Sequence, residues 1–386
     1  MLLQKPAFLL FYHTRAAEAS FGEWLGVLWH GLSLDCTVAG YVTAFPVLVV
    51  LASFWIPLSQ RVWRIVLTVY FSLIALVTAA IFAVDLNLYG YWGFRLDGSV
   101  LIYLSDPGEA LASASWGEVL RQILIMLVYA GAMIWSYRWI LRLFRVEPVP
   151  LRGRIVPTVA ALLIGGLTFL AIRGGVTVAT ANVSKVYFSS NMFLNHAATN
   201  PVFLFFFSVG DNENYAEAYP FFEEERRKTL FEELRGNRPG ADAGTPRLLR
   251  SDRPNVVLIL LESFGRTIMD ETVNGEPVMP NMQRFKREGV WFENFFANSF
   301  RTDRGQVAVL CGFPAQTTMS IMKLPRKSAT LPSLARSLGR EGYRSVFMYG
   351  GDLNFTNQAS FMYSTGWEEL IWQKDMQLDA PTSKWG

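Results

Sequence analysis

Four long apolar runs dominate the first half of the chain and limit what it can fold into. They carry no charged residue and cover residues 37–55, 65–84, 122–137 and 155–172. A membrane-spanning helix needs about 20 mostly apolar residues. The runs therefore predict four membrane helices, which we assign to an α-helical membrane domain over residues 1–180.

Composition supports this assignment and excludes several classes of protein. Hydrophobic residues make up 51% of the chain and charged residues only 17%, whereas soluble domains carry about 25% charged residues. This excludes a purely soluble chain and a disordered one. The net charge of +3 is balanced, and a nucleic-acid partner would require a concentrated basic face. We therefore expect no nucleic-acid binding.

The charges between the runs predict their orientation. Two loops are basic, with Arg61, Arg64, Arg142, Arg145, Arg152 and Arg154. The loop between them is rich in acids: Asp85, Asp97, Asp106, Glu109 and Glu118. Basic loops stay in the cytoplasm, so we expect the acidic loop and the C-terminal part on the other side. Asp35 and Arg173 flank predicted spans, and we expect them to contact lipid head groups.

A bridge is predicted over residues 181–252. Its apolar run, Pro201–Val209, has nine residues and is too short to cross a bilayer, so it should lie in the interface or pack against the spans. The charged cluster at 223–228 indicates a solvated helix, and the Gly- and Pro-containing stretch after it indicates a linker.

From Pro254 onward the pattern becomes that of an α/β domain, assigned to residues 253–386. The apolar runs at 255–261, 290–296 and 343–349 predict strands. The segments 280–288 and 332–340 begin with Pro and end near Gly, which predicts helices. Strands that alternate with helices indicate crossover connections and a mostly parallel sheet.

Three places in this domain carry residues suited to chemistry. Glu262 follows the first predicted strand, where open α/β sheets hold their ligands; it could equally be an ordinary strand-end acid. Thr302 stands at the start of a predicted helix, where a phosphate would meet free N–H groups, or it is a plain N-cap. Asp352 and Asn354 follow the strand 343–349 and are also compatible with simple turn chemistry.

Taken together, these segments resemble the lipoteichoic acid synthase family. The resemblance rests on NVVLILLESF, on PVMPNM, on FENFFANSFRTDRG and on VFMYGGD, in this order after the membrane helices. These synthases are membrane-anchored enzymes of the alkaline phosphatase and sulfatase superfamily. The resemblance thus implies that the C-terminal part is a piece of an extracytoplasmic sulfatase-like domain, held at the bacterial cytoplasmic membrane by a multi-pass anchor.

The family resemblance also implies roles for particular residues. Glu262 would be a metal ligand, and Thr302 both a ligand and the nucleophile that carries a covalent phosphoglycerol group. The metal would be divalent, typically manganese. Phosphatidylglycerol would be the donor, and a glycan or lipid the acceptor. The substrate-binding residues implied are Arg304, Asp352, Asn354, Phe355 and Asn357.

The chain departs from the family pattern in two places. Phe355 and Asn357 stand where the synthases carry Trp and Arg, which leaves phosphoethanolamine transfer and a periplasmic glucan acceptor open. The superfamily completes its metal site with a downstream Asp-His pair, and no histidine follows His196 here. We therefore expect the sequence to be truncated at its C-terminus, and at its N-terminus as well, and to be inactive as it stands.

Two further interpretations remain. A sulfatase-like hydrolase is one, although Cys311 lies in CGFPA, which lacks the C/S-x-P-x-R motif of formylglycine sulfatases. The other is a non-catalytic membrane protein that binds a partner through its half-domain. Such a half-sheet would expose unpaired edges, which proteins normally avoid.

Overall fold

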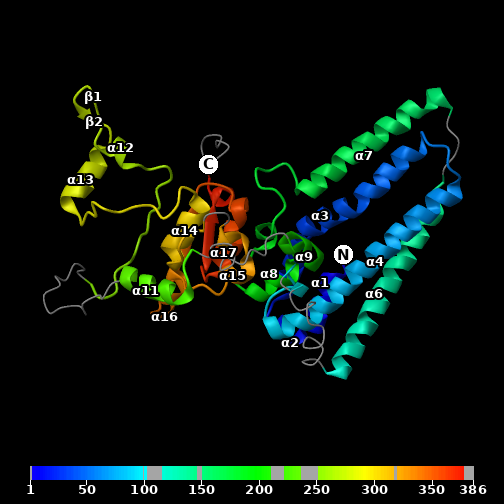
Figure 1. Cartoon of the computed structure of the whole chain (residues 1–386), viewed down its shortest axis with the longest axis horizontal. Coiled ribbons are helices and arrows are strands. Elements are labelled where there is room, and N and C mark those ends of the chain that lie inside the picture. The colour runs from blue at the N-terminus through cyan, green and yellow to red at the C-terminus, as the bar shows by residue number, and fades with distance from the viewer. Residues whose placement is uncertain are drawn as a thin grey trace. The chain divides into compact units, whose positions relative to one another are not determined.

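A computed structural model describes residues 2–98, 100–101, 115–145, 150–209, 221–235, 251–316 and 320–377. Its N-terminal part is helical (Figure 1). Two short helices, α1 (Gln4–Phe11) and α2 (His13–Ala16), precede four long ones. These are α3 (Phe21–Ser53), α4 (Gln60–Trp92), α6 (Trp116–Leu143) and α7 (Ile155–Arg173). By length and composition, all four could cross a membrane, so each predicted span lies in a suitable helix.

Local sequence explains where these helices begin and end. Ser20 and Ser115 start α3 and α6 with capping boxes. In each, the Ser hydroxyl accepts a bond from the backbone N–H of the glutamate three residues later, and the carboxylate of that glutamate accepts a bond from the Ser backbone N–H. Gly93 and Gly174 end α4 and α7 with positive φ angles of 65° and 84°, a conformation that glycine adopts without strain.

The four long helices pack in pairs, α4 along α6 and α3 along α7. Their main core lies toward α1, η3 (Val183–Val186), α8 (Met192–Ala198) and α9 (Pro201–Val209). Helices α8 and α9 meet at 87°, and as one broken unit they would count as a fifth candidate span. Because the first four residues of α9 are buried against this core, the predicted packing of this short run against the spans is confirmed.

Two buried ion pairs correct the prediction for the acidic residues. Asp35 lies within α3, not at its edge, and its carboxylate is 2.6 Å from Lys5 Nζ. Asp85 lies within α4, not in a loop, and is 2.9 Å from an Arg95 guanidinium nitrogen. The apolar pattern could not place them because a buried charge is tolerated only with a partner, which lies elsewhere in the sequence. The predicted loop residues Asp106 and Glu109 lie outside the described residues.

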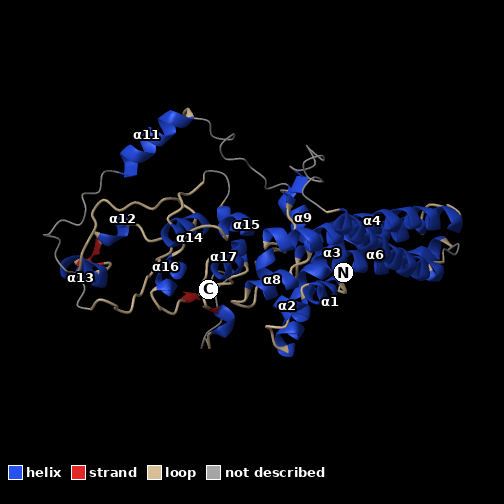
Figure 2. Cartoon of the chain, turned by 90° about the horizontal axis from the view of Figure 1, so that it is seen from below, coloured by secondary structure: helices blue, strands red, loops and turns tan. Residues whose placement is uncertain are grey.

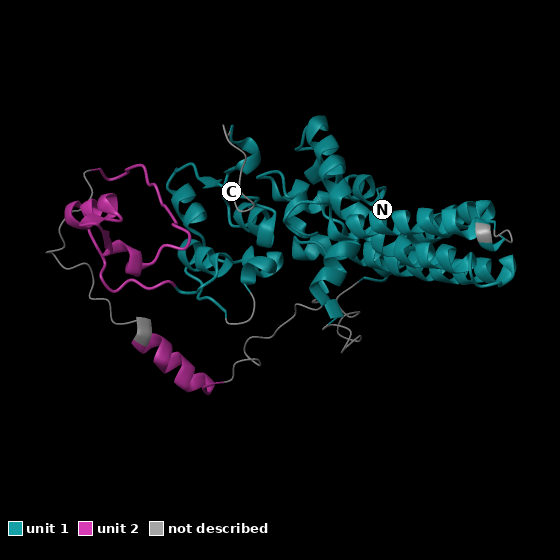
Figure 3. Cartoon of the chain, turned by 90° about the horizontal axis from the view of Figure 1, so that it is seen from above, with its two compact units in different colours: residues 1–212, 298–386 teal, residues 213–297 magenta. Residues whose placement is uncertain are grey.

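The chain forms two compact units (Figure 3). Residues 1–212 and 298–386 make the first, so the helical part and the last segment belong together. Its C-terminal part contains α14 (Thr302–Cys311), η4 (Ile321–Lys323), α15 (Pro325–Ser328), α16 (Leu334–Arg340), β3 (Val346–Tyr349), η5 (Phe355–Asn357), α17 (Gln358–Ser364), β4 (Glu369–Trp372) and η6 (Gln373–Asp375). The strand predicted at 343–349 and the helix predicted at 332–340 are present in shortened form.

The sheet of this part is small (Figure 2). Strands β3 and β4 pair in parallel, with Val346 opposite Glu369 and Tyr349 opposite Trp372. Helices α14 and α17 contribute Val307, Leu310, Phe361 and Met362 to one apolar core that also takes in Phe347. A two-stranded piece does not establish the mostly parallel sheet that the sequence predicts.

The second unit, residues 213–297, contains α11 (Glu224–Arg235), α12 (Arg266–Met269), the antiparallel pair β1 (Thr272–Val273) and β2 (Glu276–Pro277), and α13 (Pro280–Glu288). Helix α13 has the predicted bounds. Helix α11 is the predicted solvated helix, with exposed ion pairs from Lys228 to Glu224 and Glu225. The predicted linker at 236–247 lies outside the described residues, and the predicted domain boundaries at 180 and 252 stay predictions.

Two predicted strands do not form. Residues 255–261 and 290–296 have no regular secondary structure, and most of their apolar side chains are exposed. An apolar run becomes a strand only when a neighbouring strand takes up its N–H and C=O groups. Within the described residues the sheets are β1–β2 and β3–β4, and neither includes these runs.

We predict that the Asp85–Arg95 pair is essential to the membrane domain. Replacing Arg95 with Met leaves a buried carboxylate without a counterion and should lower the free energy of unfolding by about 3–5 kcal/mol. Titration with denaturing detergent in mixed micelles measures this. The double variant Asp85→Leu/Arg95→Met should recover most of the loss, because no unpaired charge remains.

The exposed pair between Arg344 and Glu369 is the matched control. Replacing Arg344 with Met should change stability by no more than about 1 kcal/mol, since water already screens this pair. Equal losses at Arg95 and Arg344 would contradict the role given to the buried pair.

Candidate functional site

Thr302 is the first residue of α14, as the sequence predicts, and its side chain is exposed. The rest of the helix explains its orientation. Positions 303, 304, 306, 307, 310 and 311 are buried. Val309, seven residues after Thr302 and hence on the same helix face, is exposed. The packing of α14 therefore turns the Thr302 hydroxyl away from the core.

The start of α14 is suited to a negatively charged group. The first turn of a helix leaves backbone N–H groups without intrahelical partners and carries the positive end of the helix dipole. Arg301, the residue before the helix, makes no side-chain cap bond. Arg304, predicted to bind substrate, is buried, with its guanidinium 5.7 Å from the ring centre of Phe300.

The loop after β3 contains the other predicted substrate residues. Asp352 accepts bonds from the backbone N–H of Asn354 at 2.9 Å and from its side-chain amide at 2.8 Å, so it stabilises its own turn. Asn357 is buried and donates to Lys323 O at 3.4 Å. Phe355 is half-buried. The loop thus has a defined conformation; that these residues bind substrate stays a prediction.

One short helix links α14 with this loop. Ser320 donates to Asp303 O at 2.8 Å, and its oxygen also caps η4 by accepting from Met322 N. The same helix ends at Lys323, whose carbonyl accepts from Asn357. The structure therefore connects the start of α14 and the loop 352–357 through η4, and Ser320 is a residue that the sequence analysis missed.

Glu262 lies in the other compact unit. It is exposed and accepts a bond from the Ser263 hydroxyl at 3.1 Å, and Ser263 itself has a positive φ of 54°. The strand that was expected to carry Glu262 is absent, so its predicted place at the carboxyl end of a strand is wrong. Its role as a metal ligand stays a prediction.

The described residues do not form a complete metal site. Glu262 and Thr302 would supply hard oxygen ligands of the kind that divalent cations prefer. Two such ligands are too few, and among the described residues no group of three or more His, Cys, Asp or Glu side chains is placed to hold a metal ion. The described residues by themselves therefore do not complete the coordination of a divalent ion.

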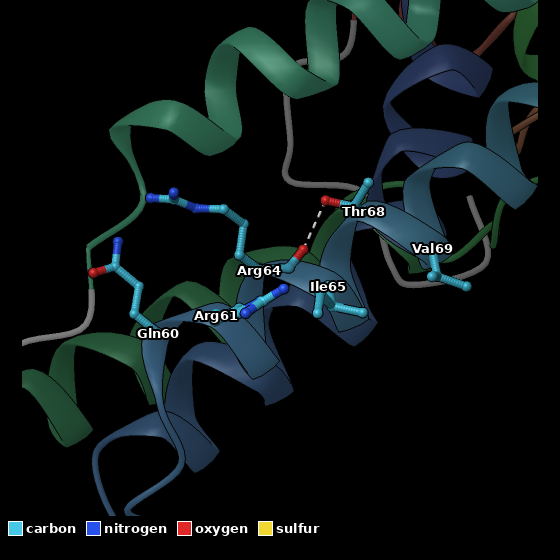
Figure 4. Close-up of a pocket in the computed structure, with 6 residues that line it drawn as sticks. All are labelled: Gln60, Arg61, Arg64, Ile65, Thr68 and Val69. Carbon is cyan, nitrogen blue, oxygen red and sulfur yellow. Dashed lines mark hydrogen bonds between the residues drawn. The ribbon is translucent and has the colours of Figure 1, made fainter.

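A surface hollow lies elsewhere, on α4. It has a volume of about 490 Å³ and is lined by Gln60, Arg61, Arg64, Ile65, Thr68 and Val69 (Figure 4). Arg64 donates to Phe144 O at 3.3 Å, which ties the start of α4 to the end of α6. This hollow carries the arginines that predict a cytoplasmic loop and includes none of the predicted site residues.

Comparison with known proteins identifies the C-terminal part. Residues 254–382 match the model of the sulfatase family. Phosphoglycerol transferase I of Xanthomonas campestris pv. campestris is 36% identical over 124 residues, which is 30% of this chain and 17% of that protein. Lipoteichoic acid synthase 1 of Bacillus subtilis is 31% identical over 130 residues, 30% of this chain and 19% of that protein. No solved structure matches significantly.

Residues 254–382 are thus a sulfatase-family segment of the alkaline phosphatase superfamily. Within that superfamily the segment is lipoteichoic acid synthase-like, which confirms the resemblance seen in the sequence. The matched region spans less than a fifth of these relatives.

Cys311 tests the sulfatase interpretation. It is buried at the end of α14, and burial raises the pKa of its thiol from the usual 9.0 to about 11. At pH 8 its thiolate fraction should fall about a hundredfold, so alkylation by iodoacetamide should slow by a similar factor relative to a free thiol. Mass spectrometry of the intact and the denatured protein measures this.

The unfolded chain is the control, because in it Cys311 should react at the ordinary rate. The Cys311 peptide should have the mass of unmodified cysteine. A formylglycine mass at this position would contradict our interpretation and favour a true sulfatase.

Proposed function

We propose that this chain belongs to a membrane-anchored phosphoglycerol transferase that moves phosphoglycerol from phosphatidylglycerol to an extracytoplasmic glycan or lipid. The observation that carries the proposal is Thr302, an exposed threonine that lies within the sulfatase-family match and opens α14. The names of the relatives support phosphoglycerol as the transferred group.

The proposed reaction has two steps. First, the Thr302 hydroxyl oxygen attacks the phosphorus of the donor. A bond from Oγ to phosphorus forms, the bond to the diacylglycerol oxygen breaks, and the threonine proton ends on the released diacylglycerol. Then a hydroxyl of the acceptor attacks the same phosphorus, and Thr302 regains its proton. Backbone N–H groups at the start of α14 would stabilise the phosphoryl oxygens.

A divalent metal, typically manganese, belongs to the proposal, since the superfamily is generally metal-dependent and a threonine hydroxyl is a weak nucleophile without activation. Glu262 and Thr302 are the residues proposed to hold it. When bound, such an ion would lower the pKa of the hydroxyl and offset negative charge on the phosphoryl group.

Phosphoethanolamine transfer is the alternative for the same fold. The names of the relatives favour phosphoglycerol, while Phe355 and Asn357 depart from the pattern of the synthases. The measurements below separate the two donors, because each lipid can be labelled in its own head group.

The first test is covalent labelling of Thr302. The full-length protein from its native membrane, given phosphatidylglycerol labelled in the glycerol head group and Mn²⁺, should carry the label on the peptide that contains Thr302. Thr302→Val removes the hydroxyl with little change in shape and should lower labelling and transfer at least about a thousandfold.

Thr330→Val is the matched control, because Thr330 is also exposed and lies outside the site. EDTA should abolish labelling, and added Mn²⁺ should restore it. Label from phosphatidylethanolamine instead would replace the proposed donor, and a labelled Thr302→Val variant would exclude the proposed nucleophile. The same assay on the 386 residues alone tests whether they turn over.

The orientation can be tested with single cysteines. Ser59 precedes α4, is exposed and makes no side-chain cap bond, and Ser337 is exposed on α16. A membrane-impermeant maleimide should label Ser337→Cys in intact cells and Ser59→Cys only after permeabilisation, if the sulfatase-family segment faces outward. The reverse pattern would place the proposed site in the cytoplasm and exclude an outer-leaflet donor.

A further inference from the structure

Helix α17, which follows the candidate substrate loop, is capped by a residue from a distant part of the sequence. Its own N-cap residue, Asn357, has a φ of 65° and makes no side-chain cap bond. Instead, Ser184 Oγ accepts a bond at 3.0 Å from the backbone N–H of Ser360 in the first turn of α17. Both residues are buried. Since an N-terminal N–H has no partner within its helix, Ser184 performs the role of an N-cap across 176 residues.

Asn182 holds the loop itself. Its side-chain nitrogen donates to Asn354 O at 2.8 Å and to Thr180 O at 2.9 Å, while its oxygen accepts from Ser184 N at 2.9 Å. One buried amide therefore fixes the backbone of the loop and, at the same time, the position of the Ser184 cap. Both residues belong to the segment that follows the membrane helix α7.

The loop needs such support because its backbone is strained. Thr356 has a φ of 54° and Asn357 a φ of 65°. A β-branched threonine rarely adopts this left-handed conformation, which persists only where surrounding contacts determine it. Besides bonds within the loop and α17 themselves, such as Ala359 N–H to Leu353 O at 2.9 Å, the loop is held by Asn182 and Ser184 on one side and by the bond that Asn357 donates to Lys323 O on the other.

A charged residue of the same segment adds to the contact. Lys185 lies near Asp352 and donates to Gly174 O at 2.5 Å. Partial burial lowers the pKa of Lys185, and the carboxylate of Asp352 opposes this shift. The segment after α7 therefore presents a cation to the loop as well as two hydrogen-bonding side chains.

We propose that Asn182 and Ser184 are positioning residues of the candidate site: they hold the loop 352–357 in its strained conformation and fix it to the membrane domain. This inference rests on the proposed function and deepens it. We call the contact of Asn182 and Ser184 with this loop the clamp. A substrate loop fixed to the membrane domain favours a donor that is itself in the membrane. The clamp therefore selects a lipid-borne phosphodiester over a soluble one.

Two variants remove these bonds: Asn182→Asp loses the two that its nitrogen donates, to Asn354 O and Thr180 O, and Ser184→Ala loses the one that its hydroxyl accepts. Asn182→Asp keeps the shape of the side chain and its acceptor oxygen but cannot donate to Asn354 O. Ser184→Ala removes the cap of α17. Ser208→Ala is the matched control, because Ser208 Oγ also accepts a bond from a backbone N–H far along the chain, that of Gly98 at 2.7 Å, yet Ser208 belongs to neither the loop, α17 nor the segment after α7.

Amide hydrogen exchange of the full chain in lipid nanodiscs tests the clamp without any need for activity. Exchange at residues 353–361 should become about threefold to tenfold faster in Asn182→Asp and Ser184→Ala, as expected for the loss of one net hydrogen bond. In Ser208→Ala it should stay as in the wild type at these residues. Equal exchange in all four proteins overturns the proposal.

Kinetics of the full-length protein test positioning. With phosphatidylglycerol vesicles, the KM of both clamp variants should rise about threefold to tenfold, with a smaller change in kcat, since Thr302 is untouched. Faster exchange with an unchanged KM would overturn the positioning role. If the wild type transfers nothing, the proposed function fails, and the exchange measurement alone decides whether the membrane domain holds the loop.

Discussion

The pairing of buried charges at one end of the helical bundle governs how the rest of the first unit is arranged. Asp85 is fully buried in α4 and can stay charged there only with a partner. Arg95 supplies that partner, and the Asp85 carboxylate also accepts from Leu96 N at 2.9 Å. These bonds fold the chain after α4 back onto the bundle.

The stretch after α4 also contacts the sulfatase-family segment. Asp97, two residues after Arg95, pairs with Arg326 of α15 at 3.3 Å, and the Arg326 guanidinium lies 4.0 Å from the ring centre of Trp92. The end of α4 thus provides one attachment for the C-terminal part, and the segment after α7 provides another through Asn182 and Ser184. Two attachments from different helices restrict rotation as well as separation, so the loop 352–357 has a defined place relative to the bundle.

The features that the sequence predicts correctly are those encoded locally. The four long helices follow from apolarity and length, and the bounds of α13 follow from Pro280 and Gly289. The start of α14 at Thr302 follows from the helix-compatible run after it. The strand expected at 255–261 does not form, because a strand depends on pairing with neighbouring strands, and the local sequence pattern does not reveal whether such neighbours are present.

Long-range polar contacts were beyond prediction for a related reason. Asn182 and Ser184 look like ordinary polar residues between helices, and their partners lie 172 and 176 positions away. Asp35 shows the same difficulty, since its partners are Lys5 and Asn200. A single sequence reveals a polar residue close to a predicted membrane span, but it does not reveal which residue forms the hydrogen bond or ion pair with it.

The part of the candidate site that could be predicted is therefore the place of Thr302 at the start of α14, and the part that could not is the support around it. Helix α14 buries Val307, Leu310 and Cys311 on one face, which sets its rotation and leaves Thr302 outward. Its first turn is joined to η4 through Asp303 O and Ser320, and η4 is joined to the loop through Lys323 O. One short helix thus joins the start of α14 to the loop, through residues that the sequence pattern does not mark.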